Sequence, residues 1–221
     1  MKLNVTFQKE NMTFRPDFHT VVTVDLGEAN LRPLLDGTMT GGYEDDKLTY
    51  LRMGAFAQCE NLTAVRLPNC VCFGMSRHFY ECKNITELHL PKLKEIQDAT
   101  YVFYGLSKLK TISLPELTAI TTGFSGTFWG YEALECIELP KLGGVTIQTY
   151  AFRNCRNLHT LILGGDTLNP LSNTNAFNNA GNAPGVNLRI YVPDALVEAY
   201  KTANNWSSFA DKITPISAWE G

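Results

Sequence analysis

Six cysteines and four histidines are the residues of this sequence best suited to metal binding or redox chemistry. The pair in "CVC", residues 70–72, would point its thiols to opposite sides of an extended chain and could not ligate one ion together. The histidines, which show no metal-like spacing, are His19, His78, His89 and His159. Motifs such as G-x-S-x-G, H-E-x-x-H or a phosphate-cradling glycine loop do not occur in the sequence. We therefore expect neither an enzyme nor a metal or cofactor site.

A repeated segment explains more of the chain than any catalytic motif. "AFAQCENLTAV" at residues 55–65 returns as "AFRNCRNLHTL" at residues 151–161, with weaker copies between them. Phenylalanines recur every 23 to 25 residues, at Phe56, Phe79, Phe103, Phe128, Phe152 and Phe177. Eleven residues after the first five of them stand Leu67, Leu90, Leu114, Leu139 and Leu163. A fixed period of this length predicts a solenoid of stacked coils.

Each coil contains the pattern of one short strand. "AVRL", "ELHL", "TISL" and "CIEL" alternate apolar with polar or small residues, as a strand with one buried face does. Proline follows in four copies and ends the strand, because it cannot donate to a sheet ladder. The Ala-Phe segment then closes the coil as a short helical or 3₁₀ turn. One coil cannot bury its own apolar face, so neighbouring coils must stack.

The flanking segments complete the predicted architecture. Residues 1–50 are predicted to be an amino-terminal β-rich cap or small module, and residues 51–168 five coils. Residues 169–221 would hold a degenerate, loosely packed last coil and a helical cap. Such caps would cover the apolar ends and free strand edges of the stack. The cap helix is predicted to begin after Pro193, with an apolar face formed by Leu196, Ala199, Tyr200 and Ala203.

Three of the cysteines share one position of the repeat. In the copies where Cys59, Cys82 and Cys155 do not occur, this position holds Leu106 or Tyr131. A position that accepts such residues is an apolar core site, so the cysteines are predicted to be small buried hydrophobes. Cys59 and Cys82 would lie on adjacent coils, and a disulfide between them stays open.

Two outward-facing columns are candidate binding surfaces. Immediately after successive phenylalanines stand Tyr80, Tyr104 and Trp129, followed in the next coil by Arg153. A ladder of exposed aromatic rings suits sugar rings or a protein hot spot, although the rings could merely cover the loops between coils.

The second candidate is the outer face of the predicted front sheet. Its mixed polar residues are Arg66, Glu87, His89, Thr111 and Glu138. The sheet face of a solenoid is a common binding side, and the alternative is an ordinary solvated surface.

The pattern "AFxxCxxLxxhxLP", in which h is aliphatic, resembles the BspA-type branch of the leucine-rich repeat family. The ending "IYVPDALVEAYKTANNW" is similar to the closing segment of bacterial members. This resemblance implies a leucine-rich repeat solenoid that acts as a surface or secreted binding protein, sometimes an adhesin for host matrix proteins, without catalytic residues. The amino-terminal "MKLNVTFQKENMTF" resembles the start of prophage proteins of gut bacteria, which implies a phage component.

The composition of the chain limits the classes of partner that it could bind. With 221 residues, 44% hydrophobic content and a net charge of −3, the chain can bury a sizeable core. It has no basic run for nucleic acid and no apolar stretch of about 20 residues for membrane insertion. The amino terminus lacks the apolar core of a secretion signal, so a surface location would need another export route or a removed signal.

Three functions remain open at this point. We expect a non-catalytic, extracellular or cell-surface recognition or adhesion module that binds a host protein or glycan. The alternative is a structural or receptor-binding component of a phage tail or baseplate, which would form an oligomer. A hydrolase with an unrecognised site is the third.

Overall fold

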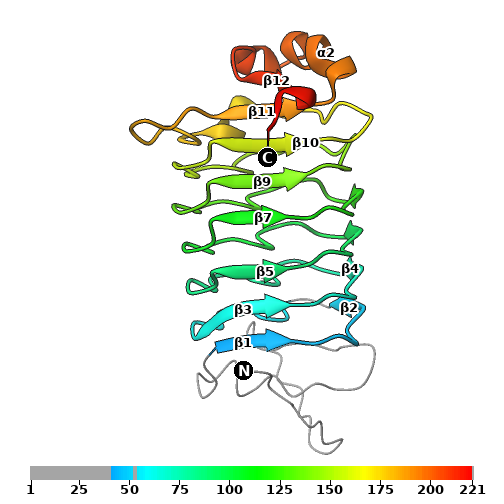
Figure 1. Ribbon diagram of the computed structural model, residues 1–221, viewed down its shortest axis with the longest axis vertical. Helices are drawn as coiled ribbons and strands as arrows, with labels where there is room; N and C mark the ends of the chain where they lie inside the picture. Colours follow the sequence, from blue (N-terminus) through cyan, green and yellow to red (C-terminus); the bar gives the residue numbers. More distant parts are fainter. Residues whose placement is uncertain (1–40, 52–53, 221) are drawn as a thin grey trace, which may run out of the picture.

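The computed structural model describes residues 41–51 and 54–220 as a stack of parallel strands (Figure 1). The described front strands, one for each coil, form a three-stranded sheet (β1-β3-β5) and a five-stranded sheet (β7-β9-β10-β11-β12). Their bounds are β1 (Gly41–Glu44), β3 (Leu62–Arg66), β5 (Glu87–His89), β7 (Thr111–Ser113), β9 (Cys136–Leu139), β10 (Thr160–Leu163), β11 (Arg189–Val192) and β12 (Ile213–Pro215). The predicted solenoid and the positions of its strands are confirmed.

A second parallel sheet stands beside the front one. Its strands are β2 (Tyr50–Leu51), β4 (Cys72–Phe73), β6 (Glu95–Ile96) and β8 (Ala119–Ile120). Each has only two residues, too few for an alternating pattern, and the sequence analysis did not predict it as a strand. The front sheet is interrupted between β5 and β7, which do not pair. In the second sheet the strands of the same two coils, β6 and β8, do pair. The coils on either side of the interruption are therefore joined along this second side.

The six repeated phenylalanines form one continuous stack, which we call the inner ladder. Neighbouring ring centroids are 5.0–5.8 Å apart and the ring planes differ by only 4–24°. The five repeated leucines are also buried, as the period predicted. Burying a phenylalanine side chain contributes about 1.5–3 kcal/mol, so the inner ladder is a major source of stability.

The turn that follows each phenylalanine contains a left-handed residue. Two positions after the inner-ladder rings, φ is between 57° and 83° in six successive coils, at Gln58, Glu81, Gly105, Gly130, Asn154 and Asn179. In the first five of these coils the backbone N–H of this residue donates to the next coil, as Glu81 N does to Tyr104 O at 2.8 Å. Thr174–Phe177 is a 3₁₀ helix (η1), whereas the earlier coils form successive hydrogen-bonded turns at this place.

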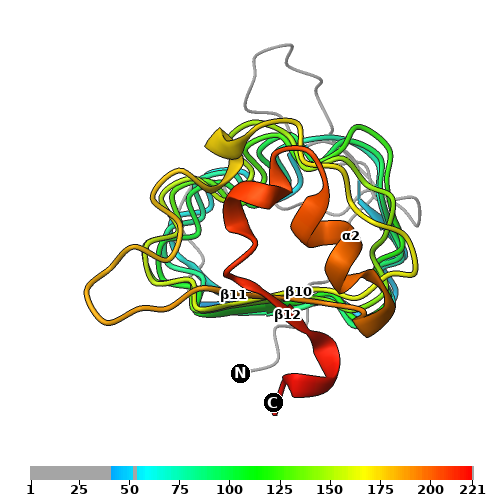
Figure 2. The same cartoon turned by 90° about the horizontal axis from the view of Figure 1, so that it is seen from above.

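Short helices cover the carboxyl-terminal end of the stack (Figure 2). They are η2 (Asp194–Leu196), α2 (Val197–Thr202) and η3 (Trp206–Phe209). Tyr200 and Trp206 are fully buried, and both bind the buried Asn169: its backbone N–H donates to the Tyr200 hydroxyl, and Trp206 Nε1 donates to its carbonyl. One element of the prediction is wrong, because Ala199 is exposed. The change from a 3₁₀ turn to a six-residue α-helix rotates the apolar face, and Val197 packs on the core instead.

The last coil is not loosely packed. Phe177 is 5% exposed and lies between Phe152, at 5.0 Å, and the end helices, where Trp206 is 5.7 Å and Phe209 4.9 Å away between ring centroids. The predicted frayed packing around Phe177 is therefore wrong. The reason is that Trp206 and Phe209 of η3 pack on Phe177 at the place where the phenylalanine of a further coil would otherwise lie.

At the amino-terminal side, β1 pairs in parallel with β3 and β2 with β4. Stacking therefore begins no later than Gly41, ahead of the predicted start of the repeats at residue 51. The rest of the predicted amino-terminal cap, residues 1–40, lies outside the described residues, as does the segment that resembles prophage proteins.

Candidate binding surfaces

The three aromatic residues that follow the inner-ladder phenylalanines do form a row. The rings of Tyr80 and Tyr104 stack at 5.1 Å with planes 16° apart, and Tyr104 meets Trp129 edge to face at 5.7 Å. All three are partly buried. Each ring packs against its neighbour on one side and is accessible to solvent on the other, so the three residues are neither fully exposed nor part of the core.

Two further tyrosines, which the sequence analysis missed, join this row. Tyr101 contacts both Tyr104 (5.6 Å) and Trp129 (6.3 Å), and Tyr150 contacts Trp129 (5.4 Å). Both stand two positions before an inner-ladder phenylalanine and have positive φ. The recurrence of tyrosine at that position was the available signal. We call the five rings the aromatic stripe: Tyr80, Tyr101, Tyr104, Trp129 and Tyr150.

A glycine makes room for the stripe. Gly126 occupies the same repeat position as Tyr101 and Tyr150, and its φ is 59°. A Cβ added there would lie 2.5 Å from Cε1 of Tyr101, which is too close for any real contact. A side chain at Gly126 would therefore push the Tyr101 ring out of the row between Tyr104 and Trp129.

Two arginines lie on the aromatic rings. The guanidinium carbon of Arg153 is 5.2 Å from the Trp129 ring centre and 4.7 Å from that of Tyr150, and Arg77 lies 5.7 Å from Tyr80. These are cation–π distances. Nε of Arg153 is buried and has no hydrogen-bond partner. Within the described ranges, neither arginine forms an ion pair with a carboxylate.

The tyrosine hydroxyls of the stripe are also open to a ligand. Within residues 41–51 and 54–220, the hydroxyls of Tyr80, Tyr101, Tyr104 and Tyr150 form no hydrogen bond to the protein. Partial burial raises the pKa of Tyr80, and the neighbouring Glu81 carboxylate raises it further. This hydroxyl therefore stays protonated near neutral pH and can donate as well as accept a hydrogen bond.

On the sheet face, two of the predicted residues pair with each other. Arg66 holds Glu87 through two charge-assisted hydrogen bonds, one of them from Nε at 2.6 Å. The hydrogen bond to Glu87 is the main reason that the pKa of Arg66 is raised. Glu138 is partly buried and accepts a weak hydrogen bond from the Cys136 thiol at 3.8 Å.

His89 and Thr111 lie on the same face and are exposed. In the described part of the chain their side chains form neither a hydrogen bond nor an ion pair. They lie on β5 and β7, on opposite sides of the interruption in the front sheet. These two exposed residues are thus carried by strands that do not pair with each other.

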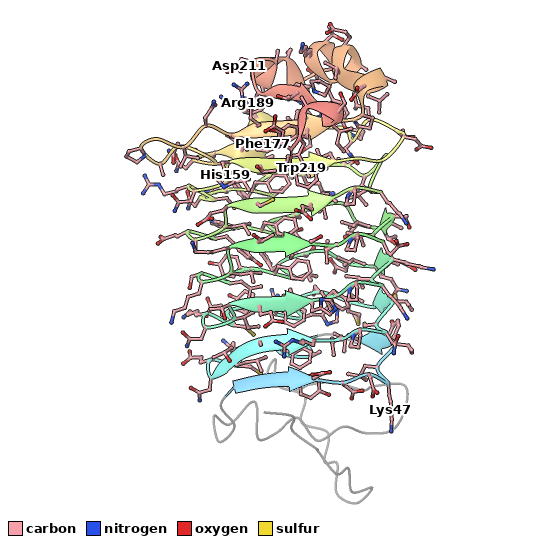
Figure 3. The ribbon with its side chains drawn as sticks, viewed as in Figure 1. Lys47, His159, Phe177, Arg189, Asp211 and Trp219 are labelled. Atoms are coloured by element: carbon pink, nitrogen blue, oxygen red, sulfur yellow. The ribbon has the colours of Figure 1, made fainter. Side chains whose placement is uncertain are left out.

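The carboxyl-terminal part of the sheet face is covered by the chain itself. Thr160 and Ile162 of β10 point outward, yet they are only 9% and 1% exposed. The last helix, η4 (Ile216–Ala218), lies on the outer side of the sheet, and Trp219 stands in front of β10 (Figures 2 and 3). The accessible sheet face is therefore shorter than the stack.

A shallow cavity of about 260 Å³ lies on the loop side of the late coils. Its lining residues are Glu132, Arg156, Asn157, Asn182, Ala183 and Pro184. This lining contains one carboxylate, Glu132, and one guanidinium, Arg156, which stays protonated, so the cavity offers no pair of groups for general acid–base catalysis.

The cysteines are free thiols in the structure, Cys59 and Cys82 included. The Cys82 thiol donates to Phe56 O at 2.7 Å, and Cys155 donates to Phe128 O at 3.0 Å. Burial raises the pKa of Cys155 to about 12 and that of Cys82 well above its usual value. Thiols held protonated in this way are poor nucleophiles and metal ligands. Among the described residues there is no cluster of three or more histidine, cysteine or acidic side chains that could hold a metal ion.

Comparison with known families agrees with this geometry. The model of the "BspA type Leucine rich repeat region (6 copies)" matches residues 44–159 and 73–189. The chain belongs to the BspA-type leucine-rich repeat family. Proteins of this family are generally non-catalytic. A search of curated proteins finds no match to this BspA-type chain.

Solved structures similar to this BspA-type protein exist. One of them is a leucine-rich repeat protein from T. pallidum, 19% identical, with a TM-score of 0.40 over 74% of this chain and 83% of that one. No helix in the described part of the chain is both long and apolar enough to cross a membrane.

Proposed function

We propose that this protein is a non-catalytic recognition or adhesion module at the cell surface or outside the cell, and that it binds a host protein or glycan through the aromatic stripe. One observation carries the proposal. Five aromatic rings from four successive coils touch one another on the surface, with hydroxyls and guanidinium groups that form no hydrogen bond or ion pair to any described residue. Aromatic and arginine side chains are enriched among the residues that dominate binding energy.

The sheet face is the weaker candidate because two of its charged groups, Arg66 and Glu87, already pair with each other. Arg66 and Glu87 would have to give up a bidentate ion pair to bind a ligand. A ligand that binds the stripe would not have to break an ion pair, since the arginines of the stripe lie on aromatic rings rather than beside carboxylates. A ligand on the stripe therefore gains contacts without breaking existing ones.

The test is an array of glycans and host matrix proteins, followed by titration of the best binder with two variants. Trp129→Ala should weaken binding by about 2 kcal/mol, or roughly thirtyfold, as the loss of an aromatic anchor does. Thr111→Ala, an exposed change on the sheet face, is the matched control and should leave affinity unchanged. A ligand that ignores Trp129→Ala but responds to changes at Thr111, Glu87 and His89 would assign function to the sheet face instead.

A phage tail or baseplate role is the alternative, supported by the amino-terminal resemblance. It predicts a symmetric trimer or larger assembly by size-exclusion light scattering. A strict monomer at high concentration would contradict that role and leave the recognition module.

A further inference from the structure

We infer that the ligand of the aromatic stripe is an acidic saccharide, a chain of uronic-acid type whose carboxylates are held by Arg153 and Arg77. This inference rests on the proposed function of the stripe. It goes further by naming the chemical class of the ligand and two residues, absent from the predicted site, that select it.

The first support is the state of the two guanidinium groups. Of the five arginines in the described part of the chain, three donate hydrogen bonds to the protein: Arg66 to Glu87, Arg156 to Asn182 and Arg189 to Asp211 O. The other two, Arg77 and Arg153, form no such bond, and both lie on the stripe. Unpaired arginines among the described residues thus occur only where the exposed rings are.

The second support is pre-organisation. Arg153 is in contact with two rings, Trp129 and Tyr150, and is partly buried. Stacking fixes the plane of the guanidinium, so less side-chain freedom is lost when its N–H groups bind a carboxylate. Partial removal from water also strengthens such a charge-assisted hydrogen bond.

The third support is the shape and chemistry of the rest of the stripe. Its rings form a row rather than a pocket, and the shallow cavity of the late coils is lined by residues outside the stripe. A peptide would normally anchor a large side chain in a pocket. A sugar chain instead lays flat apolar ring faces on aromatic rings, while its hydroxyl groups need hydrogen-bond partners at the edges. The free tyrosine hydroxyls supply these partners.

The spacing of the charges fits an oligomer rather than a single sugar. Arg77 precedes Phe79 and Arg153 follows Phe152, three coils further along the stack. With about 4.8 Å between neighbouring strands, the two guanidinium groups are separated by roughly 15 Å along the stack. One sugar ring cannot reach both groups, whereas a short acidic chain can.

The experiment uses an oligogalacturonate and the same oligosaccharide after chemical reduction of its carboxyl groups, each titrated calorimetrically into the full chain. We expect the acidic form to bind at least about tenfold more tightly, the worth of one charge-assisted hydrogen bond. Arg153→Gln should remove about tenfold of the affinity for the acidic form and little of that for the reduced form. Arg77→Gln, at an exposed residue, is a second variant with less risk to folding and should act in the same direction.

The matched control is Arg156→Gln, in the same coil as Arg153 but hydrogen-bonded to Asn182 instead of lying on the stripe. It should leave affinity for the acidic oligosaccharide unchanged. A melting curve of each variant separates lost binding from lost folding.

The possible outcomes separate this inference from the proposed function. Equal binding of the acidic and reduced forms, both lost in Trp129→Ala, would overturn the inference and keep the stripe as a glycan site. If the oligogalacturonate does not bind but a protein or a neutral glycan binds through Trp129, the inference is also overturned and the stripe remains the binding surface. Competition by polyglutamate as strong as by the oligogalacturonate would replace the saccharide by an acidic peptide. Binding that survives both Trp129→Ala and Arg153→Gln would overturn the inference and the proposed function together.

Discussion

The protein carries two aromatic ladders that differ in almost everything except their spacing. In the inner ladder the phenylalanine rings are nearly parallel and buried on all sides. In the aromatic stripe, whose residues stand one position after or two positions before these phenylalanines, the rings meet at angles from 16° to 85° and stay partly open to solvent. The rise of the coils sets the spacing of both. The inner rings are fixed by packing on all sides, whereas the rings of the stripe keep exposed surface that a ligand could contact.

The comparison predicts its largest effect in the inner ladder. Phe103→Ala should lower the free energy of unfolding by about 3–5 kcal/mol, because the ring has stacked neighbours on both sides and the coils cannot close around the cavity. Phe177→Ala should cost a similar amount, since Phe152 and the end helices enclose that ring. Chemical denaturation measures both. A much smaller loss at Phe177 would show that the end helices pack weakly.

Acid should destabilise the protein through a histidine beside the inner ladder. His78 is fully buried, 4.7 Å from the Phe73 ring, and its two ring nitrogens have no hydrogen-bond partner. Desolvation lowers its pKa to about 3, although the Met75 backbone and, less strongly, the Asp98 charge act in the opposite direction. Between about pH 3 and pH 6.5 the unfolded chain binds a proton that the folded chain does not, so stability falls as the pH is lowered.

The slope from this one group is at most about 1.4 kcal/mol per pH unit. Denaturation curves at a series of pH values would measure it, with His78→Leu as the comparison. If the variant loses stability between pH 6 and pH 4 as steeply as the natural sequence, His78 is not the cause.

In the stripe, Trp129→Ala should have a smaller effect on stability than Phe103→Ala. We expect a loss of about 1–2 kcal/mol, because the ring leaves contacts with Tyr101, Tyr104 and Tyr150 but opens no closed cavity. Its effect on binding should be larger than its effect on folding. Thermal unfolding and calorimetric titration of the same preparation give the two numbers, and a stability loss equal to that of Phe103→Ala would place Trp129 in the core.

The smallest effect is expected at the left-handed residues that stand two positions after the inner-ladder phenylalanines. Glu81 has φ of 57°, a conformation that costs most residues about 1 kcal/mol and glycine nothing. Glu81→Gly should therefore raise the free energy of unfolding by about 0.5–1 kcal/mol. The reverse change at the equivalent Gly130, to alanine, should lower it. An unchanged or lowered stability of Glu81→Gly would mean that the Glu81–Lys83 ion pair outweighs the backbone strain.

The sequence predicted the inner ladder well because burial imposes a strict rule. A position that faces the core of every coil must be apolar in every coil, so Phe103 and Leu114 stand out by their period. The strands followed from the same alternation. The two-residue strands such as Cys72–Phe73 could not be predicted, since so short a segment carries no period.

The stripe could be predicted only in part. Tyr80, Tyr104 and Trp129 share a repeat position, but Tyr101 and Tyr150 reach the row through left-handed backbone that no hydrophobic pattern reports. The role of Arg153 depends on contacts with two rings from different turns. Likewise, the covering of Ile162 depends on a segment far along the chain. These are tertiary effects, and they decide which part of the surface remains open.

The three tryptophans allow one direct test of the central claim, that the stripe rather than the sheet face is the binding surface. Trp129 belongs to the stripe, Trp219 stands in front of β10 on the sheet face (Figure 3), and Trp206 is buried beneath the end helices. Fluorine NMR of 5-fluorotryptophan-labelled protein, titrated with the best binder from the array, would report on all three at once. We predict that the Trp129 resonance shifts with ligand concentration while those of Trp206 and Trp219 stay in place. A shift of the Trp219 resonance with Trp129 unmoved would contradict the account.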